Sequence, residues 1–145
     1  MKIDELIEKA LIRKEKVNKE EISGSIGLAE RFIKRAEGNL KINFWDVAFL
    51  LAYNSLFHSA RALLFKHEYK ERSHWAMILA LKEIYDKNEK IQKILDLVDT
   101  YRISRHAIQY SGSLCTKLDA EEIIKDAKEF LEIVKQIFKE SKWYS

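Results

Sequence analysis

The chain has 145 residues, of which 47% are hydrophobic and 34% are charged, and its formal net charge is +3. This length fits one domain with a real core, and the composition excludes both a disordered chain and one embedded in a membrane over most of its length. The net charge is too small to indicate a nucleic-acid binder by itself. The chain has no proline and only four glycines, so few residues oblige a helix to end.

Two helices are predicted before residue 40. Apolar side chains at helical spacing predict the first over about Ile3–Val17. Asn18, followed three residues later by Glu21, predicts the start of the second. We expect that helix to end at Gly38-Asn39, because glycine and asparagine favour helix C-termini.

The third predicted helix is apolar on almost every side. Asn43 is the expected N-cap, with Asp46 near the positive end of the helix, which extends to about Glu68. A helix with apolar side chains all round lies at the centre of a bundle.

Three more helices complete the predicted fold. Ser73 is the expected cap of a fourth helix that reaches Tyr85, the fifth spans about Glu89–Tyr110, and Asp119 caps the sixth. No segment shows the alternation of a strand. The sequence therefore predicts an all-α fold in one domain over residues 1–145, an antiparallel up-and-down bundle of five to six helices.

The N-terminal segment and the single cysteine bear on the cellular compartment. Met1–Glu5 is too acidic for a secretory signal, and the longest apolar runs, Val47–Tyr53 and Trp75–Leu81, are shorter than a bilayer span. Cys115 has no second cysteine with which to form a disulfide, as is common in a reducing compartment. We expect a cytoplasmic protein without a membrane partner.

The fifth predicted helix carries the most informative polar pattern. Its apolar stripe from Ile91 to Val98 is continued on the same face by polar side chains, Arg102, Arg105 and Gln109, with His106 and Tyr110 at the edge of that face. Arginine offers a flat fork of donors to phosphate oxygens, and histidine can move a proton at neutral pH. Because burying unpaired guanidinium groups is costly, this half of the helix must face a groove, a partner or an anion.

Simpler explanations stand beside this one. The arginines of the fifth helix could belong to a salt-bridge network with carboxylates such as Glu30 or Glu37. In the third helix Asn54, His58 and Arg61 form another polar stripe, which could meet the fifth-helix face across a groove. A histidine satisfied inside the core is the ordinary explanation there.

The other two histidines, His67 and His74, flank the loop before the fourth helix. His74 follows the capping serine and is expected to be a surface or cap residue. No histidine pair combines with carboxylates at a metal-ligand spacing, and no glycine-rich phosphate loop is present, so we expect neither a metal nor a cofactor.

Several segments resemble one known family. Residues Ala52–Leu64 read Ala-Tyr-Asn-Ser-Leu-Phe-His-Ser-Ala-Arg-Ala-Leu-Leu and resemble the third-helix signature of small prokaryotic HEPN proteins. Ser73-His74, Arg105–Tyr110 and Asp119–Glu122 are similar to later landmarks of that family. The resemblance covers roughly residues 18–138.

The resemblance implies a helical bundle that dimerises and that often works beside a minimal nucleotidyltransferase in a toxin–antitoxin-like pair. Its catalytic branch is a metal-independent endoribonuclease that uses an arginine and a later histidine with four to six residues between them. Here His106 has only three residues between it and Arg102 and directly follows Arg105. Neither arginine is followed by a histidine at the family spacing.

Three functions remain open at this stage. We expect a homodimeric partner of a minimal nucleotidyltransferase, with the third and fifth helices near the dimer interface and a polar cleft for nucleotide or RNA phosphate. The alternatives are a metal-independent endoribonuclease toxin with a degenerate motif, and a structural bundle without a ligand. The residues assigned to the cleft are Arg102, Arg105 and His106 as catalytic groups and His58, Arg61 and Tyr110 as nucleotide- or RNA-binding groups.

Overall fold

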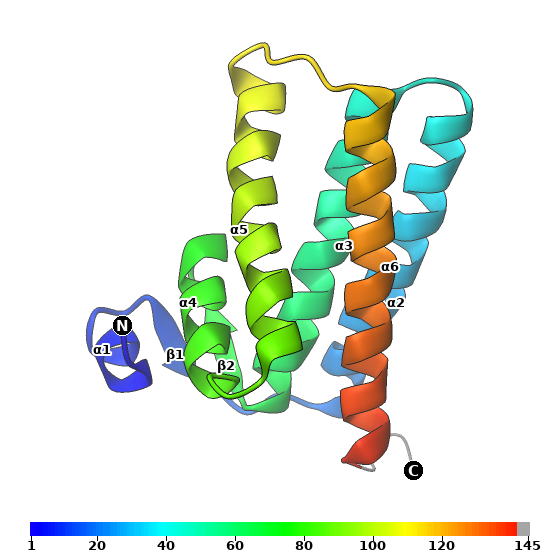
Figure 1. Ribbon diagram of the computed structural model, residues 1–145. Coiled ribbons are helices and arrows are strands. Elements are labelled where there is room, and N and C mark those ends of the chain that lie inside the picture. Colours follow the sequence, from blue (N-terminus) through cyan, green and yellow to red (C-terminus); the bar gives the residue numbers. More distant parts are fainter. Residues whose placement is uncertain (142–145) are drawn as a thin grey trace.

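The computed structural model describes residues 1–141, which form six helices and two short strands (Figure 1). In chain order these are α1 (Ile3–Glu8), β1 (Ile12–Lys14), α2 (Lys19–Lys41), α3 (Trp45–Lys66), β2 (Tyr69–Glu71), α4 (His74–Ile84), α5 (Glu89–Tyr110) and α6 (Lys117–Glu140). The prediction of an all-α helical bundle is confirmed.

Helix α3 is the central rod of the bundle, as its sequence predicted. It contacts α2, α4, α5 and α6, and its buried side chains lie on all sides. Ser55 Oγ donates a hydrogen bond of 2.8 Å to the carbonyl oxygen of Ala29, which joins α3 to α2. By length and composition alone α3 could cross a membrane, but 67% of its 18-residue apolar window is buried by the other helices. That burial is typical of a core helix.

The N-terminal region differs from the prediction. The helix expected over Ile3–Val17 ends at Glu8, because Ala10 adopts a φ of 56°, in the left-handed region. The chain then forms β1, which pairs antiparallel with β2 and places Arg13 opposite Lys70. The expectation of a continuous first helix is therefore wrong, as is the expectation that no segment forms a strand.

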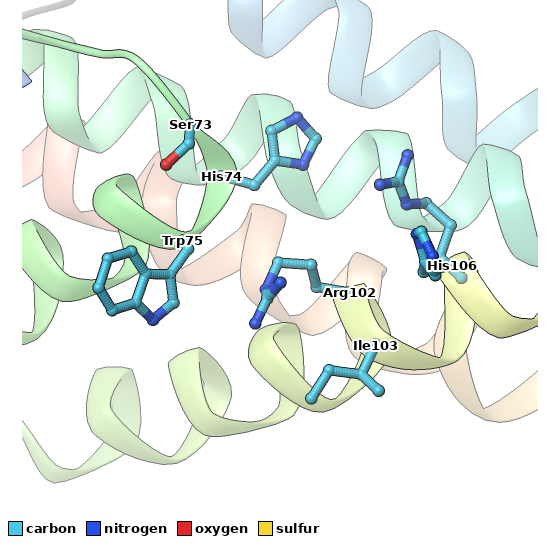
Figure 2. Close-up of a pocket in the computed structure, with 7 residues that line it drawn as sticks. Ser73, His74, Trp75, Arg102, Ile103 and His106 are labelled. Carbon is cyan, nitrogen blue, oxygen red and sulfur yellow. The ribbon is translucent and has the colours of Figure 1, made fainter. Parts of the chain in front are cut away.

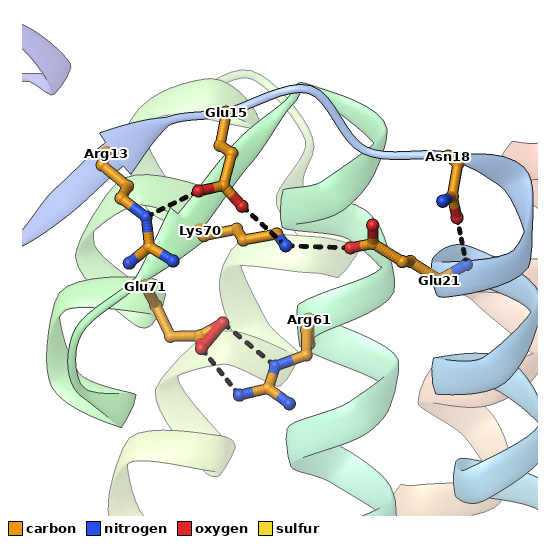
Figure 3. A network of polar contacts seen from close by, with 7 residues as sticks. All are labelled: Arg13, Glu15, Asn18, Glu21, Arg61, Lys70 and Glu71. Atoms are coloured by element: carbon orange, nitrogen blue, oxygen red, sulfur yellow. Dashed lines mark hydrogen bonds and ion pairs between the residues drawn. The ribbon is translucent and has the colours of Figure 1, made fainter.

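Ion pairs around Lys70 explain why the strand pairing is favoured. Lys70 Nζ lies 2.7 Å from a carboxylate oxygen of Glu15 and 2.9 Å from one of Glu21 (Figure 3). Arg13 Nε donates to the other oxygen of Glu15 at 3.0 Å. This network connects β2 to β1 and to the first turn of α2, which a helix continuing through residue 17 could not allow.

Two of the predicted helix caps are confirmed, and one predicted stop is wrong. Asn18 Oδ1 accepts a hydrogen bond from the backbone N–H of Glu21, and Ser73 Oγ accepts one from the first turn of α4. Helix α5 has the predicted bounds. Helix α2, however, continues past Gly38-Asn39 to Lys41, because Leu40 still packs against the core.

The other two predicted caps are wrong. Asn43 has a φ of 65° and lies one residue before Phe44, the N-cap of α3, which makes no side-chain cap bond. Inside the first turn of α3, the Asp46 carboxylate accepts the N–H of Val47. Helix α6 begins after Thr116, and Asp119 is the third residue of the helix. Its side chain bonds back to the Thr116 N–H at 2.9 Å, which completes a capping box.

Candidate functional site: a cationic pocket between α4 and α5

Helix α5 has two halves with different surroundings. Its buried side chains are Ile91, Ile94, Leu95 and Val98, and none of the residues from Asp99 to Tyr110 is buried. Figure 1 shows α5 extending beyond α4, so the second half lacks the cover that α4 gives to the first. The polar continuation of the apolar stripe therefore lies at an accessible surface.

The accessible half of α5 forms a pocket with the start of α4. The cavity has a volume of about 590 Å³, and Figure 2 shows Arg102 extending from α5 toward the start of α4, where His74 and Trp75 lie. Two guanidinium groups and two imidazoles line it, together with a serine, a tryptophan and an isoleucine, and no carboxylate does. The lining residues are Ser73, His74, Trp75, Arg102, Ile103, Arg105 and His106. A pocket with these donors favours an anion.

The two arginines are not part of an interhelical salt-bridge network. Arg102 pairs with Asp99, one turn earlier on the same helix, with both Nε and Nη2 at 3.0 Å from Oδ1. Arg105 Nε is buried and has no hydrogen-bond partner among residues 1–141. Glu30 and Glu37, the carboxylates considered as partners, instead form ion pairs with lysines of α6. A donor buried without an acceptor costs free energy, and the guanidinium of Arg105 lies over the Tyr53 ring, 5.0 Å from its centroid.

His74 is the one titratable residue in the pocket lining that the sequence did not assign to the site. It was expected at the surface or in the cap, but it is half-buried, with Nδ1 2.8 Å from the hydroxyl of Tyr53 and its ring stacked 4.0 Å from that of Phe57. Burial lowers the pKa of His74, and the nearby Arg105 lowers it further. Its position after Ser73, at a landmark of the family resemblance, was the available signal.

His106 and Tyr110 lie at the outer side of the pocket. His106 lines the pocket and is exposed. The Tyr110 ring lies 5.0 Å from the His106 ring, but Tyr110 is 67% exposed and does not line the cavity. The structure thus brings together Arg102, Arg105 and His106 and leaves Tyr110 beside them.

His58 and Arg61 of α3 lie outside this pocket. Arg61 makes two hydrogen bonds to the Glu71 carboxylate, from Nη2 at 2.8 Å and Nε at 3.1 Å (Figure 3), and its guanidinium lies over the Phe57 ring. His58 stacks on Phe32, and burial, with Arg61 nearby, lowers its pKa to about 4. Arg61 therefore has a structural role in α3, whereas His58 packs against aromatic rings and its buried Nδ1 has no hydrogen-bond partner among residues 1–141.

The pocket offers donors for an anion rather than ligands for a metal. No group of three or more His, Cys, Asp or Glu residues suited to a metal ion occurs in residues 1–141. The pocket itself supplies guanidinium donors for phosphate oxygens and an exposed imidazole for proton transfer.

Comparisons with known proteins identify the family to which this helical bundle belongs. The HEPN domain matches residues 22–137, so the chain belongs to the HEPN domain family, as the sequence resemblance indicated. A protein of Methanocaldococcus jannaschii named "Putative toxin MJ0605" is 31% identical to this chain over 134 residues. That alignment covers 91% of this chain and 98% of the relative.

Proposed function

We propose that this chain is the toxin-like member of a two-protein pair and that the α4–α5 pocket binds a phosphate group of RNA. The name of the M. jannaschii relative supports the toxin role. The observation that carries the phosphate assignment is the convergence of two guanidinium groups and two imidazoles with no carboxylate among the lining residues. Arg105 supports the same assignment, because it lines the pocket and pairs with no carboxylate among residues 1–141.

A homodimer and a minimal nucleotidyltransferase partner are part of this proposal. The apolar surface of α3 is largely taken up within the protomer, so it gives little reason to place α3 at an interface. Exposed apolar side chains instead surround the pocket: Trp75 is 42% exposed, Ile103 58% and Tyr110 67%. A second copy that covers these side chains would bring two pockets close together and exclude water from them.

Cleavage of the bound RNA is the second candidate function, favoured by the exposed imidazole of His106 beside two arginines. In this reaction His106 takes the proton of the ribose 2′-hydroxyl, and the 2′-oxygen forms a bond to phosphorus. The bond from phosphorus to the 5′-oxygen breaks, and that oxygen takes a proton from solvent or from an imidazolium of a second copy. The products are a 2′,3′-cyclic phosphate and a 5′-hydroxyl, and Arg102 and Arg105 stabilise the charge on the phosphoryl oxygens. No metal ion is required.

Incubation of a single-stranded RNA with the purified protein in a metal chelator tests the two candidates together. We expect the parent to bind the RNA and, if catalytic, to cleave it, and His106→Ala to bind without cleaving. Gln109→Ala, an exposed neighbour on α5 that does not line the pocket, is the matched control and should behave as the parent. If the parent binds RNA without cleaving it, the cleavage function is ruled out and the binding function stands. If the parent neither binds nor cleaves RNA, the proposal is contradicted.

A further inference from the structure

We propose that His74 is a phosphate-binding residue, held by Tyr53 as the neutral tautomer with its proton on Nε2, and that this N–H donates to a phosphoryl oxygen beside Arg102 and Arg105. The inference rests on the proposed function, because it assumes a phosphate group in the pocket. It goes further by assigning a third donor from a different helix and by fixing the protonation state of that donor.

The hydroxyl of Tyr53 determines the tautomer. Tyr53 has 0% exposure, and within residues 1–141 its hydroxyl bonds only to His74 Nδ1, at 2.8 Å. If Nδ1 carried the proton, the hydroxyl hydrogen would be buried without an acceptor, which is costly. The hydroxyl therefore donates to Nδ1, and the proton of a neutral His74 lies on Nε2. Burial raises the pKa of Tyr53 to about 12, so the hydroxyl keeps its hydrogen.

The charges around His74 favour the neutral ring. Arg102 and Arg105 face it from α5, Arg61 from α3 and Glu71 from β2. The one carboxylate among these is already bound by Arg61 through two hydrogen bonds. The Phe57 ring also stacks on His74, His58 lies nearby with its own pKa lowered, and His106 lines the same pocket. A cationic His74 would also break the bond from Tyr53, because its Nδ1 could no longer accept.

The other ring nitrogen is available to the pocket. His74 lines the cavity with both arginines, and its Nε2 has no hydrogen-bond partner in the described part of the chain. A neutral N–H adds a donor for an anion without adding a third positive charge beside the two guanidinium groups. The pocket therefore presents donors from two helices, two charged and one neutral, around one phosphate position.

Nitrogen-15 NMR of the histidine side chains at pH 7 tests the tautomer before any ligand is added. We expect His74 to show a protonated Nε2 and an unprotonated Nδ1. His67 is the internal control, since it bonds to a tyrosine hydroxyl through the other nitrogen, Nε2 at 3.0 Å from Tyr85, and it does not line this pocket. A cationic His74, or one protonated on Nδ1 alone, overturns the inference.

Titration with inorganic phosphate, and then with a 2′-deoxy oligonucleotide that cannot be cleaved, tests the donor role. We expect the His74 Nε2–H resonance to shift on binding while those of His67 stay in place. His74→Phe should weaken binding roughly 10-fold, and His74→Gln, which keeps a donor near the Nε2 position, should recover most of the loss.

Tyr53→Phe provides a second variant that keeps the ring in the core. It should allow both tautomers of His74 and weaken oligonucleotide binding in proportion to the loss of the Nε2–H form. Binding that Arg102→Gln abolishes but that His74→Phe leaves unchanged overturns the inference and leaves the proposed function intact. A parent that binds neither ligand overturns both.

Discussion

The polar stripes of α3 and α5 contain the same kinds of residue in different surroundings. The α3 stripe places Arg61 against Glu71 with two hydrogen bonds, and His58 stacks on Phe32 and meets the Phe57 ring edge-on. Both stripes contain a buried nitrogen without a partner among residues 1–141, His58 Nδ1 and Arg105 Nε, but the α5 stripe gives Arg105 no carboxylate and leaves His106 exposed at a cavity. An arginine and a histidine one turn apart therefore do not define a site. Whether the fold supplies a carboxylate for the arginine decides whether that arginine has a structural role or remains available to a ligand.

The largest expected effect is a loss of cleavage activity when an arginine of the α5 stripe is replaced. If the protein cleaves RNA, Arg105→Gln should lower the single-turnover cleavage rate roughly 300-fold, because it removes a donor that stabilises transition-state charge. The free energy of unfolding should change by only about 1 kcal/mol, since Arg105 forms no ion pair in the described structure and loses only the contact of its guanidinium with the Tyr53 ring. Arg31→Gln, an exposed arginine of α2, serves as the control. A cleavage rate within twofold of the parent would place Arg105 outside the chemistry.

The next effect is on stability and concerns α3. Glu71→Gln should reduce the free energy of unfolding by about 3 kcal/mol, because it leaves the guanidinium of Arg61 without its carboxylate in a mostly buried position. Urea denaturation measures the loss. The double variant Arg61→Met with Glu71→Gln should recover part of it. If Glu71→Gln costs less than about 0.5 kcal/mol, the α3 stripe is not held by this pair.

The histidine of the α3 stripe should make stability depend on pH. Its pKa is lowered from 6.5 to about 4, mainly by burial, so the unfolded chain binds a proton first as the pH falls. The contribution of neutral His58 is fully present above about pH 6.5 and is lost toward pH 4, on the order of 2 kcal/mol. His58→Phe should remove this extra loss in denaturation curves across that range. Parallel losses in parent and variant would contradict the assignment.

The smallest effect is expected at the cysteine. Cys115 is half-buried, with Sγ 3.5 Å from the carbonyl oxygen of Trp45, and burial raises its pKa to about 11. The structure packs Cys115 against the core at the start of α3. Cys115→Ser can keep this hydrogen bond, so it should cost less than about 1 kcal/mol in urea denaturation and leave RNA binding unchanged. A loss above about 2 kcal/mol would show that the thiol is a core group.

Apolar periodicity was sufficient to predict the helices that hold the pocket. Helix α5 has the predicted bounds, and the burial of α3 follows from its apolar side chains on every side. Local signals failed where longer-range contacts decide the structure. The pairing of β1 with β2 joins residues more than fifty positions apart and is stabilised by Lys70 between two carboxylates, which no local pattern contains.

Strand β2, which the sequence did not predict, also explains why part of the candidate site could not be assigned from the sequence. Without β2, nothing indicated that Glu71 would lie beside Arg61, so Arg61 was assigned to the cleft together with His58. His74 was passed over because its approach to α5 depends on how α4 docks. The polar residues of α5 that begin at Arg102 could be predicted without any long-range contact, because their spacing along one helix is visible in the sequence.

The salt dependence of binding tests most directly whether α5, and not α3, is the phosphate-binding stripe. The affinity for a short single-stranded 2′-deoxy oligonucleotide is measured between low and physiological salt for the parent, for Arg102→Gln with Arg105→Gln, and for Arg31→Gln. We predict that the α5 double variant binds more weakly and that its slope of log affinity against log salt is smaller by about 0.7, the loss of one phosphate contact on a single strand. Arg31→Gln should keep the parent slope. An unchanged slope and affinity in the double variant would contradict a phosphate site between α4 and α5.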